Sequence, residues 1–307
     1  MKNFRIILVL LIFVLFFYCK SKSEESPAPV TGILAAGATV QKLSGDFSFT
    51  EGPACDSEGN VYFTDQPNDR IMKWSINGEL TTYLTPSGRS NGLTFDGDGF
   101  LWACADEKNE LWRIDSAKQA TVVVKDYQGK LLNGPNDVWV HPDGGVYFTD
   151  PYYARNWWPN GRTMEQDCQG VYYLTSDLQS LKRVIADLQQ PNGIIGTPDG
   201  NMLYIADIGA GKTYSYSMDS EGNLTNKQLF CEMGSDGMTI DNQGNVYLTG
   251  NGVFVFDKSG KQVEHIAIPE SWTANVCFGG ADMQTLFITA SKGLYSHKMN
   301  VKGVGSQ

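Results

Sequence analysis

Residues 51–65 read EGPACDSEGNVYFTD, and variants of this stretch recur along the chain. Each copy opens with an oxygen-bearing side chain just ahead of a short apolar run, and the six positions are Glu51, Asn91, Asn136, Asn192, Asp236 and Asn275. A second apolar run follows in every copy, and these runs end at Asp65, Asp106, Asp150, Asp207, Gly250 and Ala290. Their spacings are 41, 44, 57, 43 and 40 residues. A period of about 42 residues is the length of a four-stranded propeller blade.

The composition around these repeats is that of an all-β protein. The chain has 33 glycines, and Asp-Gly and Asn-Gly turns separate short runs rich in Val, Tyr, Phe, Trp and Thr, with no long stretch of helical periodicity. We therefore predict a six-bladed β-propeller over residues 33–303. The formal net charge is −10, so neither nucleic acid nor an anionic membrane surface is an expected partner.

The last repeat lacks a fourth strand of its own. Residues 275–278, 285–290 and 293–298 supply three strands, and the chain then nearly ends. Residues 38–43 precede the first inner strand and are free to fill the vacant place. We predict that this N-terminal strand closes the last blade and removes the exposed sheet edge, which favours a monomer.

The N-terminus has the layout of an export signal. Lys2 and Arg5 precede 13 apolar residues, and Cys19 follows them, ahead of the polar segment KSKSEESPAP. Thirteen residues are too few for a membrane span, which needs about 20. We predict an export signal at 1–18 and a flexible tether at 19–32. A lipidated Cys19 would make the protein a periplasmic or cell-envelope lipoprotein, and simple secretion is the alternative because Tyr18 is larger than the residue that usually precedes such a cysteine.

The six oxygen-bearing residues are expected to form a ring. Residues at one repeat position of a propeller enter the central axis at the same height. Two of these side chains, Glu51 and Asp236, are carboxylates, whose charges repel in a partly desolvated channel unless a cation compensates them or one is protonated. All six donors are oxygens, which suits a hard cation: Ca²⁺ first, then Mg²⁺ or Mn²⁺, with Zn²⁺ as a weaker alternative. A second interpretation stays open, because Asn before Gly is also a common turn residue that satisfies nearby backbone amides.

Four short motifs resemble those of the gluconolactonase, senescence-marker-protein and luciferin-regenerating-enzyme-like family. They are Glu51-Gly52-Pro53, Pro135-Asn136-Asp137 followed by YFTDP at 147–151, Pro191-Asn192-Gly193, and Asp236-Gly237-Met238. The resemblance spans almost the whole chain after the signal. It implies a six-bladed propeller with one divalent metal at one end of the axis.

The same resemblance implies roles for individual residues. Glu51, Asn192 and Asp236 would ligate the metal, and Asp236 would also transfer the proton. Asn136 would contact the substrate or complete the metal's ligands. The repeat, and not the resemblance, adds Asn91 and Asn275 as axial residues that lie in the ring or behind the ligands. Some members carry an arginine two residues before the substrate-binding asparagine. This chain has Gly134 there, and Asn133 is expected to substitute.

The implied activity is metal-dependent hydrolysis of a lactone, or of a related ester or organophosphate. The metal would polarise the carbonyl, and a water would attack it. The alternative is a non-catalytic propeller with a structural metal that binds a ligand or a protein partner, because propellers are reused for many functions.

One repeat is longer than the others, and its extra residues lie at 151–169. This segment contains two tyrosines, two tryptophans, Arg155 and Arg162. Two interpretations have equal support: the loop roofs the axial cleft, or its aromatic side chains pack on the neighbouring blade. Either arginine could bind an anionic group of the substrate.

Overall fold

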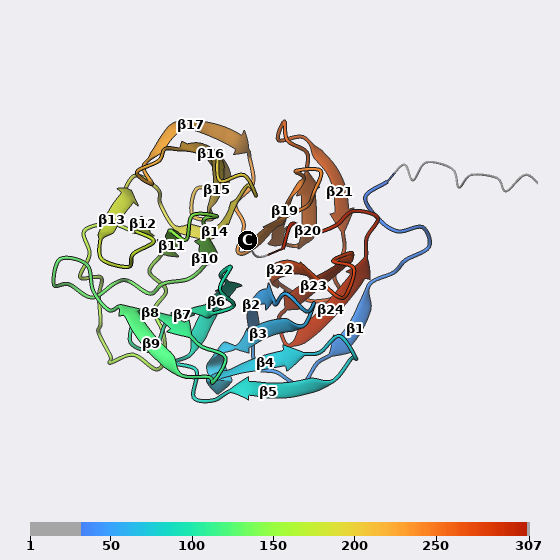
Figure 1. The fold of residues 1–307 in the computed structure, drawn as a ribbon, viewed down its shortest axis with the longest axis horizontal. Coiled ribbons are helices and arrows are strands. Elements are labelled where there is room, and N and C mark those ends of the chain that lie inside the picture. The colour runs from blue at the N-terminus through green and yellow to red at the C-terminus, as the bar shows by residue number, and fades with distance from the viewer. Residues whose placement is uncertain (1–31, 306–307) are drawn as a thin grey trace, which may run out of the picture. The chain divides into compact units, whose positions relative to one another are not determined.

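The computed structural model describes residues 32–305, and the predicted signal and nearly all of the tether lie outside that range. The described chain forms six four-stranded antiparallel sheets that surround a central axis (Figure 1). This confirms the predicted six-bladed propeller. Within residues 32–305, no helix has the length and apolar character that crossing a bilayer requires.

The strands of each blade follow chain order from the axis outward. Blades one to three comprise β2 (Thr50–Cys55), β3 (Val61–Asp65), β4 (Arg70–Trp74) and β5 (Leu80–Leu84); β6 (Ser90–Phe95), β7 (Leu101–Ala105), β8 (Glu110–Ile114) and β9 (Ala120–Val124); and β10 (Val138–Val140), β11 (Val146–Asp150), β12 (Gly170–Leu174) and β13 (Leu181–Ile185). Blades four to six comprise β14 (Pro191–Gly196), β15 (Met202–Asp207), β16 (Lys212–Met218) and β17 (Leu224–Cys231); β18 (Met238–Ile240), β19 (Val246–Gly250), β20 (Gly252–Phe256) and β21 (Gln262–Ile266); and β22 (Thr273–Gly279), β23 (Thr285–Ala290) and β24 (Gly293–Lys298). A short 3-10 helix, η1 (Gln66–Asn68), follows β3.

The N-terminal strand β1 (Gln41–Ser44) completes the sixth blade. It pairs antiparallel with β24, with Gln41 opposite Ser296, and Leu34 forms a further bridge to Met299. Figure 1 shows the blue N-terminal strand beside the red C-terminal one. The predicted closure is therefore present, although the strand begins three residues later than the predicted segment.

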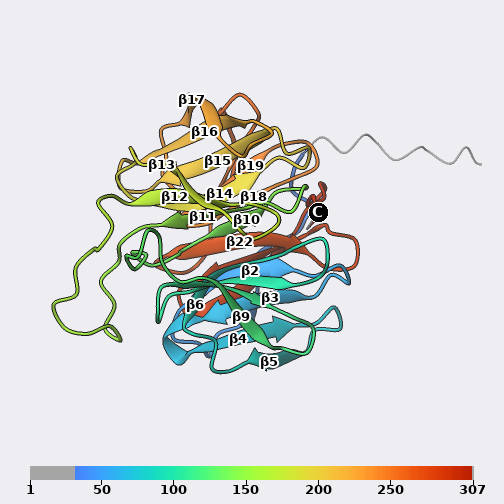
Figure 2. The same ribbon diagram turned by 60° about the vertical axis from the view of Figure 1, so that its left-hand side comes forward.

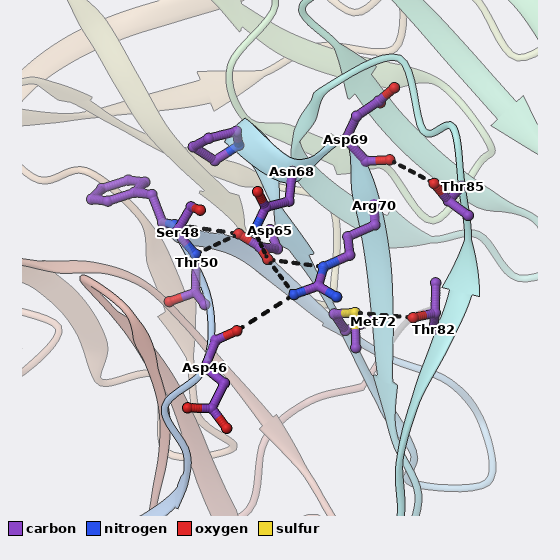
Figure 3. A network of polar contacts seen from close by, with 12 residues as sticks. Asp46, Ser48, Thr50, Asp65, Asn68, Asp69, Arg70, Met72, Thr82 and Thr85 are labelled. Atoms are coloured by element: carbon purple, nitrogen blue, oxygen red, sulfur yellow. Dashed lines mark hydrogen bonds and ion pairs between the residues drawn. The ribbon is translucent and has the colours of Figure 1, made fainter.

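A carboxylate at the end of the second strand fixes the start of the inner strand in three blades. In blade one, Oδ1 of Asp65 accepts the backbone N–H groups of Ser48 and Phe49, at 2.9 and 3.3 Å. Its Oδ2 accepts the Arg70 guanidinium and the Asn68 amide (Figure 3). Satisfying these buried backbone donors fixes the approach to the axis.

Apolar packing between blades supplies the core. The second strands are almost wholly buried, and side chains of the inner, second and third strands form six clusters of buried apolar residues. One of these clusters joins Leu203, Ile205 and Tyr216 of blade four to Trp139 of blade three. A rigid ring of this kind holds the residues at the axis in fixed positions, while the long segment between β11 and β12 extends from it (yellow-green in Figure 2).

Candidate active site

The inner strands carry the six predicted ring residues. Four of these residues lie within β2, β6, β14 and β22, and the other two, Asn136 and Asp236, come two residues before β10 and β18. A threonine near the end of the second strand forms a hydrogen bond to the next blade. The hydroxyl of Thr64 donates to the carbonyl of Asn91 at 3.0 Å, and that of Thr149 donates to the carbonyl of Asn192 at 2.8 Å. The same threonine therefore positions the ring residue of the next blade.

The glycine after the ring residue allows the blades to meet closely at the axis. Gly52 has φ +29°, and a Cβ on it would lie 2.3 Å from the carbonyl oxygen of Asn91. Gly92 repeats the arrangement, because its N–H donates to the carbonyl of Asn136 at 2.7 Å and an added Cβ would overlap that oxygen. A side chain at either position would force the blades apart.

A cavity of about 310 Å³ opens at this end of the axis. Four ring residues line it: Glu51, Asn91, Asn136 and Asp236. The other lining residues are Phe49, Gln66, Tyr153, Arg155, Gln190, Ile208 and Trp272. The volume lies at the lower end of the range for small-molecule sites, and apolar walls with a few convergent polar groups are typical of them.

Asp236 is held by two hydrogen bonds. Nδ2 of Asn192 donates to its Oδ1 at 2.9 Å, and the indole N–H of Trp272 donates to its Oδ2 at 2.6 Å. Burial raises the pKa of Asp236 to about 6, although these hydrogen bonds and the charge of Arg155 act in the opposite direction. The carboxyl group is therefore oriented and titrates nearer to neutrality than an exposed aspartate.

Glu51 lies in the same electrostatic environment. Burial and the charge of Asp236 raise its pKa well above the usual range, against the N–H of Gly52, which donates to Oε2 at 3.1 Å. The two carboxylates, 185 residues apart in the sequence, are thus close enough to repel. This interaction is the one that the repeat predicted.

The ring has the donors that a hard cation requires. Oδ1 of Asn91 and Oδ1 of Asn192 are buried and accept no hydrogen bond. Buried acceptors without partners are rare, and these two belong to the same ring as the two repelling carboxylates. No group of three His, Cys, Asp or Glu side chains within residues 32–305 is placed to hold a metal. A cation at this site would therefore need the amide oxygens as well as the carboxylates, which suits Ca²⁺ better than Zn²⁺.

Three predicted site residues lie outside the cavity lining: Asn133, Asn192 and Asn275. Asn192 still contacts the site, because its Nδ2 donates to Asp236 and to the Tyr153 hydroxyl. Asn133 is fully buried and outside the cavity lining, and its Nδ2 donates to the carbonyls of Asp150 and Cys168, at 3.0 Å each. Asn275 is also outside the lining, because its Oδ1 accepts the N–H of Val276 at 2.7 Å. The two bonds from Asn133 fix the start and end of the 151–169 loop, while Oδ1 of Asn133 has no hydrogen-bond partner. The substrate contact of Asn133 therefore stays a prediction.

The 151–169 loop does both of the things that its sequence allowed. Tyr153 and Arg155 line the cavity, and the Tyr153 hydroxyl accepts Nδ2 of Asn192 at 2.9 Å. Trp158 and Arg162 instead pack on blade two, where they donate to the carbonyl of Asp106 and to Oδ1 of Asn109. The start of the loop therefore lines the cavity, and the middle of the loop attaches it to blade two.

Sequence reasoning missed several groups at the axis. Trp272 and Gln66 have no counterparts of the same type in the other repeats, so the repeat pattern did not indicate them. Asp137, by contrast, lies inside a quoted motif. Its Oδ1 accepts the N–H of Val138 at 3.1 Å, burial raises its pKa to about 7, and it lies outside the cavity lining.

Comparison with known proteins agrees with this geometry. Residues 49–292 match the family model described as the SMP-30/Gluconolactonase/LRE-like region. The chain belongs to this family. A gluconolactonase of Zymomonas mobilis is 32% identical over 289 residues, which cover 84% of this chain and 81% of the relative.

Solved structures of the family share the fold. A gluconolactonase of Xanthomonas campestris superimposes with a TM-score of 0.81 at 28% identity, over 87% of this chain and 91% of that one. The calcium-binding protein regucalcin of Agrobacterium tumefaciens gives 0.73 at 20% identity, over 89% and 96%. The second likeness concerns the fold alone.

Proposed function

We propose that the axial cavity is the active site of a divalent-cation-dependent lactonase of the gluconolactonase type. The observation that carries the proposal is the convergence of Glu51 and Asp236 with the unpartnered amide oxygens of Asn91 and Asn192 beside a cavity of about 310 Å³. That the chain is a lactonase follows from its family and from 32% identity to a gluconolactonase over most of its length.

Glu51, Asn192 and Asp236 would hold the cation, and Asn91 supplies a further unpartnered oxygen. When bound, a divalent cation supplies Lewis acidity toward a carbonyl oxygen and compensates the two carboxylates. We expect Ca²⁺, because carboxamide ligands suit its larger and looser coordination.

Asp236 is the proposed general base. Without a bound cation its pKa is about 6, and a bound cation would favour the ionised form further, which is the form that accepts a proton from water. The hydrogen bonds from Asn192 and Trp272 orient its carboxylate toward a single direction of attack. Asn136 lines the cavity with an amide that can bind substrate oxygens, and Phe49 and Ile208 add apolar surface to its wall.

The alternative is a ligand-binding propeller with a purely structural cation. A ligand-binding protein would also have an open cavity, but the family and the 32% identity to a gluconolactonase over most of the chain support an enzyme. We therefore favour catalysis.

The test is a proton-release assay over a panel of lactones and simple esters, with and without a chelator. Hydrolysis of at least one lactone should be lost with the chelator and restored by Ca²⁺. Asp236→Asn should remain folded and lose kcat by about a hundredfold or more. No activity on any lactone or ester, from protein that holds its cation by elemental analysis, would assign the site to ligand binding.

We also propose that the protein is exported and anchored through a lipidated Cys19. The proposal rests on the sequence, in which two basic residues precede an apolar run that ends at Cys19. This segment lies outside the described residues. Fractionation of cells that express the wild type and Cys19→Ser tests it: the wild type should sediment with membranes and the variant should not.

A further inference from the structure

Asp106 departs from a regular feature of the fold. Its repeat equivalents Asp150 and Asp207 accept the backbone N–H groups that lie three and two residues before the ring residue of their own blade. Asp65 does the same in blade one. In blade two the corresponding N–H of Arg89 donates to Asp69 at 2.7 Å instead, so Asp106 is released from this role.

Asp106 instead binds two side chains that line the cavity. Its Oδ2 accepts Nε of Arg155 at 2.6 Å and Nε2 of Gln66 at 3.2 Å. Asp106 is 1% exposed, and its Oδ1 has no hydrogen-bond partner. A buried carboxylate needs hydrogen-bond donors or a partner of opposite charge, and here a charged partner comes from the 151–169 loop rather than from its own blade.

The Arg155 guanidinium is therefore hydrogen-bonded through Nε, and its terminal nitrogens have no assigned acceptor among residues 32–305. Its side chain is 19% exposed and lies over the rings of Tyr153 and Trp157, with centroid distances of 5.3 and 5.5 Å. Within residues 32–305 only its Nε has an assigned acceptor, so the two terminal nitrogens remain available at a cavity that also contains Glu51 and Asp236. Arg162, in contrast, donates to Asn109 and to the carbonyl of Leu132.

We propose that Arg155, positioned by Asp106, binds an anionic group of the substrate. The preferred substrate would then be a lactone that carries a carboxylate or a phosphate away from its reacting carbonyl. This rests on the proposed lactonase function, which it makes more specific. A cation bound by Glu51 and Asp236 would compensate both carboxylates, leaving the terminal nitrogens of Arg155 without a counter-charge on the cavity side. A planar guanidinium is the side chain best shaped to bind carboxylate or phosphate through paired hydrogen bonds.

The test compares three sugar lactones of similar size: a neutral aldonolactone, an aldarolactone with a terminal carboxylate, and a 6-phosphorylated aldonolactone. We expect the wild type to hydrolyse at least one anionic lactone with kcat/KM about tenfold or more above the neutral one, and the better anion identifies the group. Arg155→Gln should lower that anionic-to-neutral ratio about tenfold to a hundredfold, as expected for loss of charge-assisted hydrogen bonds. Asp106→Asn should lower it by a smaller factor, because the guanidinium stays but loses its fixed orientation.

Arg183→Gln is the matched control. Arg183 pairs with Asp167 at the far end of the same loop and does not line the cavity, so its loss should leave the ratio unchanged. A wild type that prefers the neutral lactone would overturn the proposal while leaving the lactonase function intact, and so would an Arg155→Gln variant with an unchanged ratio.

A binding measurement separates this proposal from the proposed function. Calorimetry with the corresponding hydroxy-acid products, in the presence of Ca²⁺, needs no turnover. We expect Arg155→Gln to weaken binding of the product with the second anionic group at least tenfold more than binding of the product without it. Should no lactone be hydrolysed, the lactonase proposal fails, whereas equal weakening of both products overturns the role of Arg155.

Discussion

Trp272 and Asp236 are joined by a 2.6 Å hydrogen bond from the indole N–H to Oδ2, although Trp272 is 37% exposed and Asp236 is buried. The tryptophan thus connects the outer edge of the cavity to the proposed general base. The bond favours the ionised form of Asp236 and opposes the effect of burial on its pKa. Trp272 is therefore a positioning residue for the reaction.

Trp272→Phe should move the acidic limb of the pH–rate profile. Removing the indole N–H while keeping an aromatic ring deletes one interaction that lowers the pKa of Asp236, so the midpoint of the limb should rise by about 0.5 to 1 pH unit. At pH 5 kcat should fall about threefold to tenfold, and at pH 7 by less than about twofold. The measurement is kcat against pH on the best lactone of the panel.

Trp112→Phe provides a control for the loss of an indole donor. Trp112 donates to Glu110 on blade two, outside the cavity, so its replacement should leave the pH profile unchanged. If Trp272→Phe gave the wild-type profile with lower stability, the hydrogen bond would have only a structural role.

The cation-free protein should become less stable as pH rises. The pKa values of Glu51 and Asp236 are higher in the folded chain than in an unfolded one, so between the two values only the folded state is protonated. Stability is then highest below the unfolded pKa, about 4, and falls as pH rises through the folded values, by at most about 1.4 kcal/mol per unit for each group.

Thermal unfolding in a chelating buffer from pH 4.5 to pH 8 measures this slope. Asp236→Asn should flatten the curve, because it removes one titrating group and the repulsion on Glu51. Addition of Ca²⁺ at pH 8 should raise the Tm of the wild type more than that of the variant. Identical slopes for the two proteins would mean that Asp236 does not titrate with a raised pKa in the folded protein.

Sequence repeats predicted this site well where every blade contributes the same position. Glu51 and Asp236 could be brought together before any coordinates because propeller symmetry places equal repeat positions around one axis. The six positions are not equal in detail, however. Oδ1 of Asn275 accepts the N–H of Val276 in the same strand. This local hydrogen bond depends on backbone geometry that the sequence pattern does not reveal.

The residues that the sequence could not place are those outside the repeat. Arg155 and Arg162 lie seven residues apart in one loop of similar composition, and only their contacts separate them. Asp106 accepts a hydrogen bond from Arg155, whereas Asn109 and the carbonyl of Leu132 accept hydrogen bonds from Arg162. These partners come from an adjacent blade, so a single sequence does not reveal the pairing.

Removal of residues 33–45 should destabilise the whole propeller. The deletion removes β1 and exposes the edge of β24, together with the apolar contacts of Ile33, Leu34 and Leu43. Loss of these partly buried side chains should cost about 4 kcal/mol or more and promote association through the exposed edge. Thermal unfolding and size-exclusion chromatography measure both effects.

A deletion of residues 20–30 serves as the comparison for length. That segment lies outside the described residues, and we expect its loss to leave the Tm and the elution volume unchanged. Equal stability of the two truncated proteins would show that the strand pairing contributes nothing to closure.

Gly52→Ala should disrupt the axis more than its backbone angle alone explains. Its Cβ would lie 2.3 Å from the carbonyl oxygen of Asn91, and backbone atoms of two packed inner strands cannot move apart without breaking contacts between blades. Gly99→Ala is the control: its φ of +83° is also positive and disfavoured for alanine, but a Cβ there meets nothing within 4 Å. Denaturant unfolding should therefore give a loss of about 1 kcal/mol for Gly99→Ala and about 3 kcal/mol or more for Gly52→Ala, with weaker Ca²⁺ binding only in the second. Equal losses would place the cost in the backbone angle and contradict the close approach of blades one and two beside Glu51.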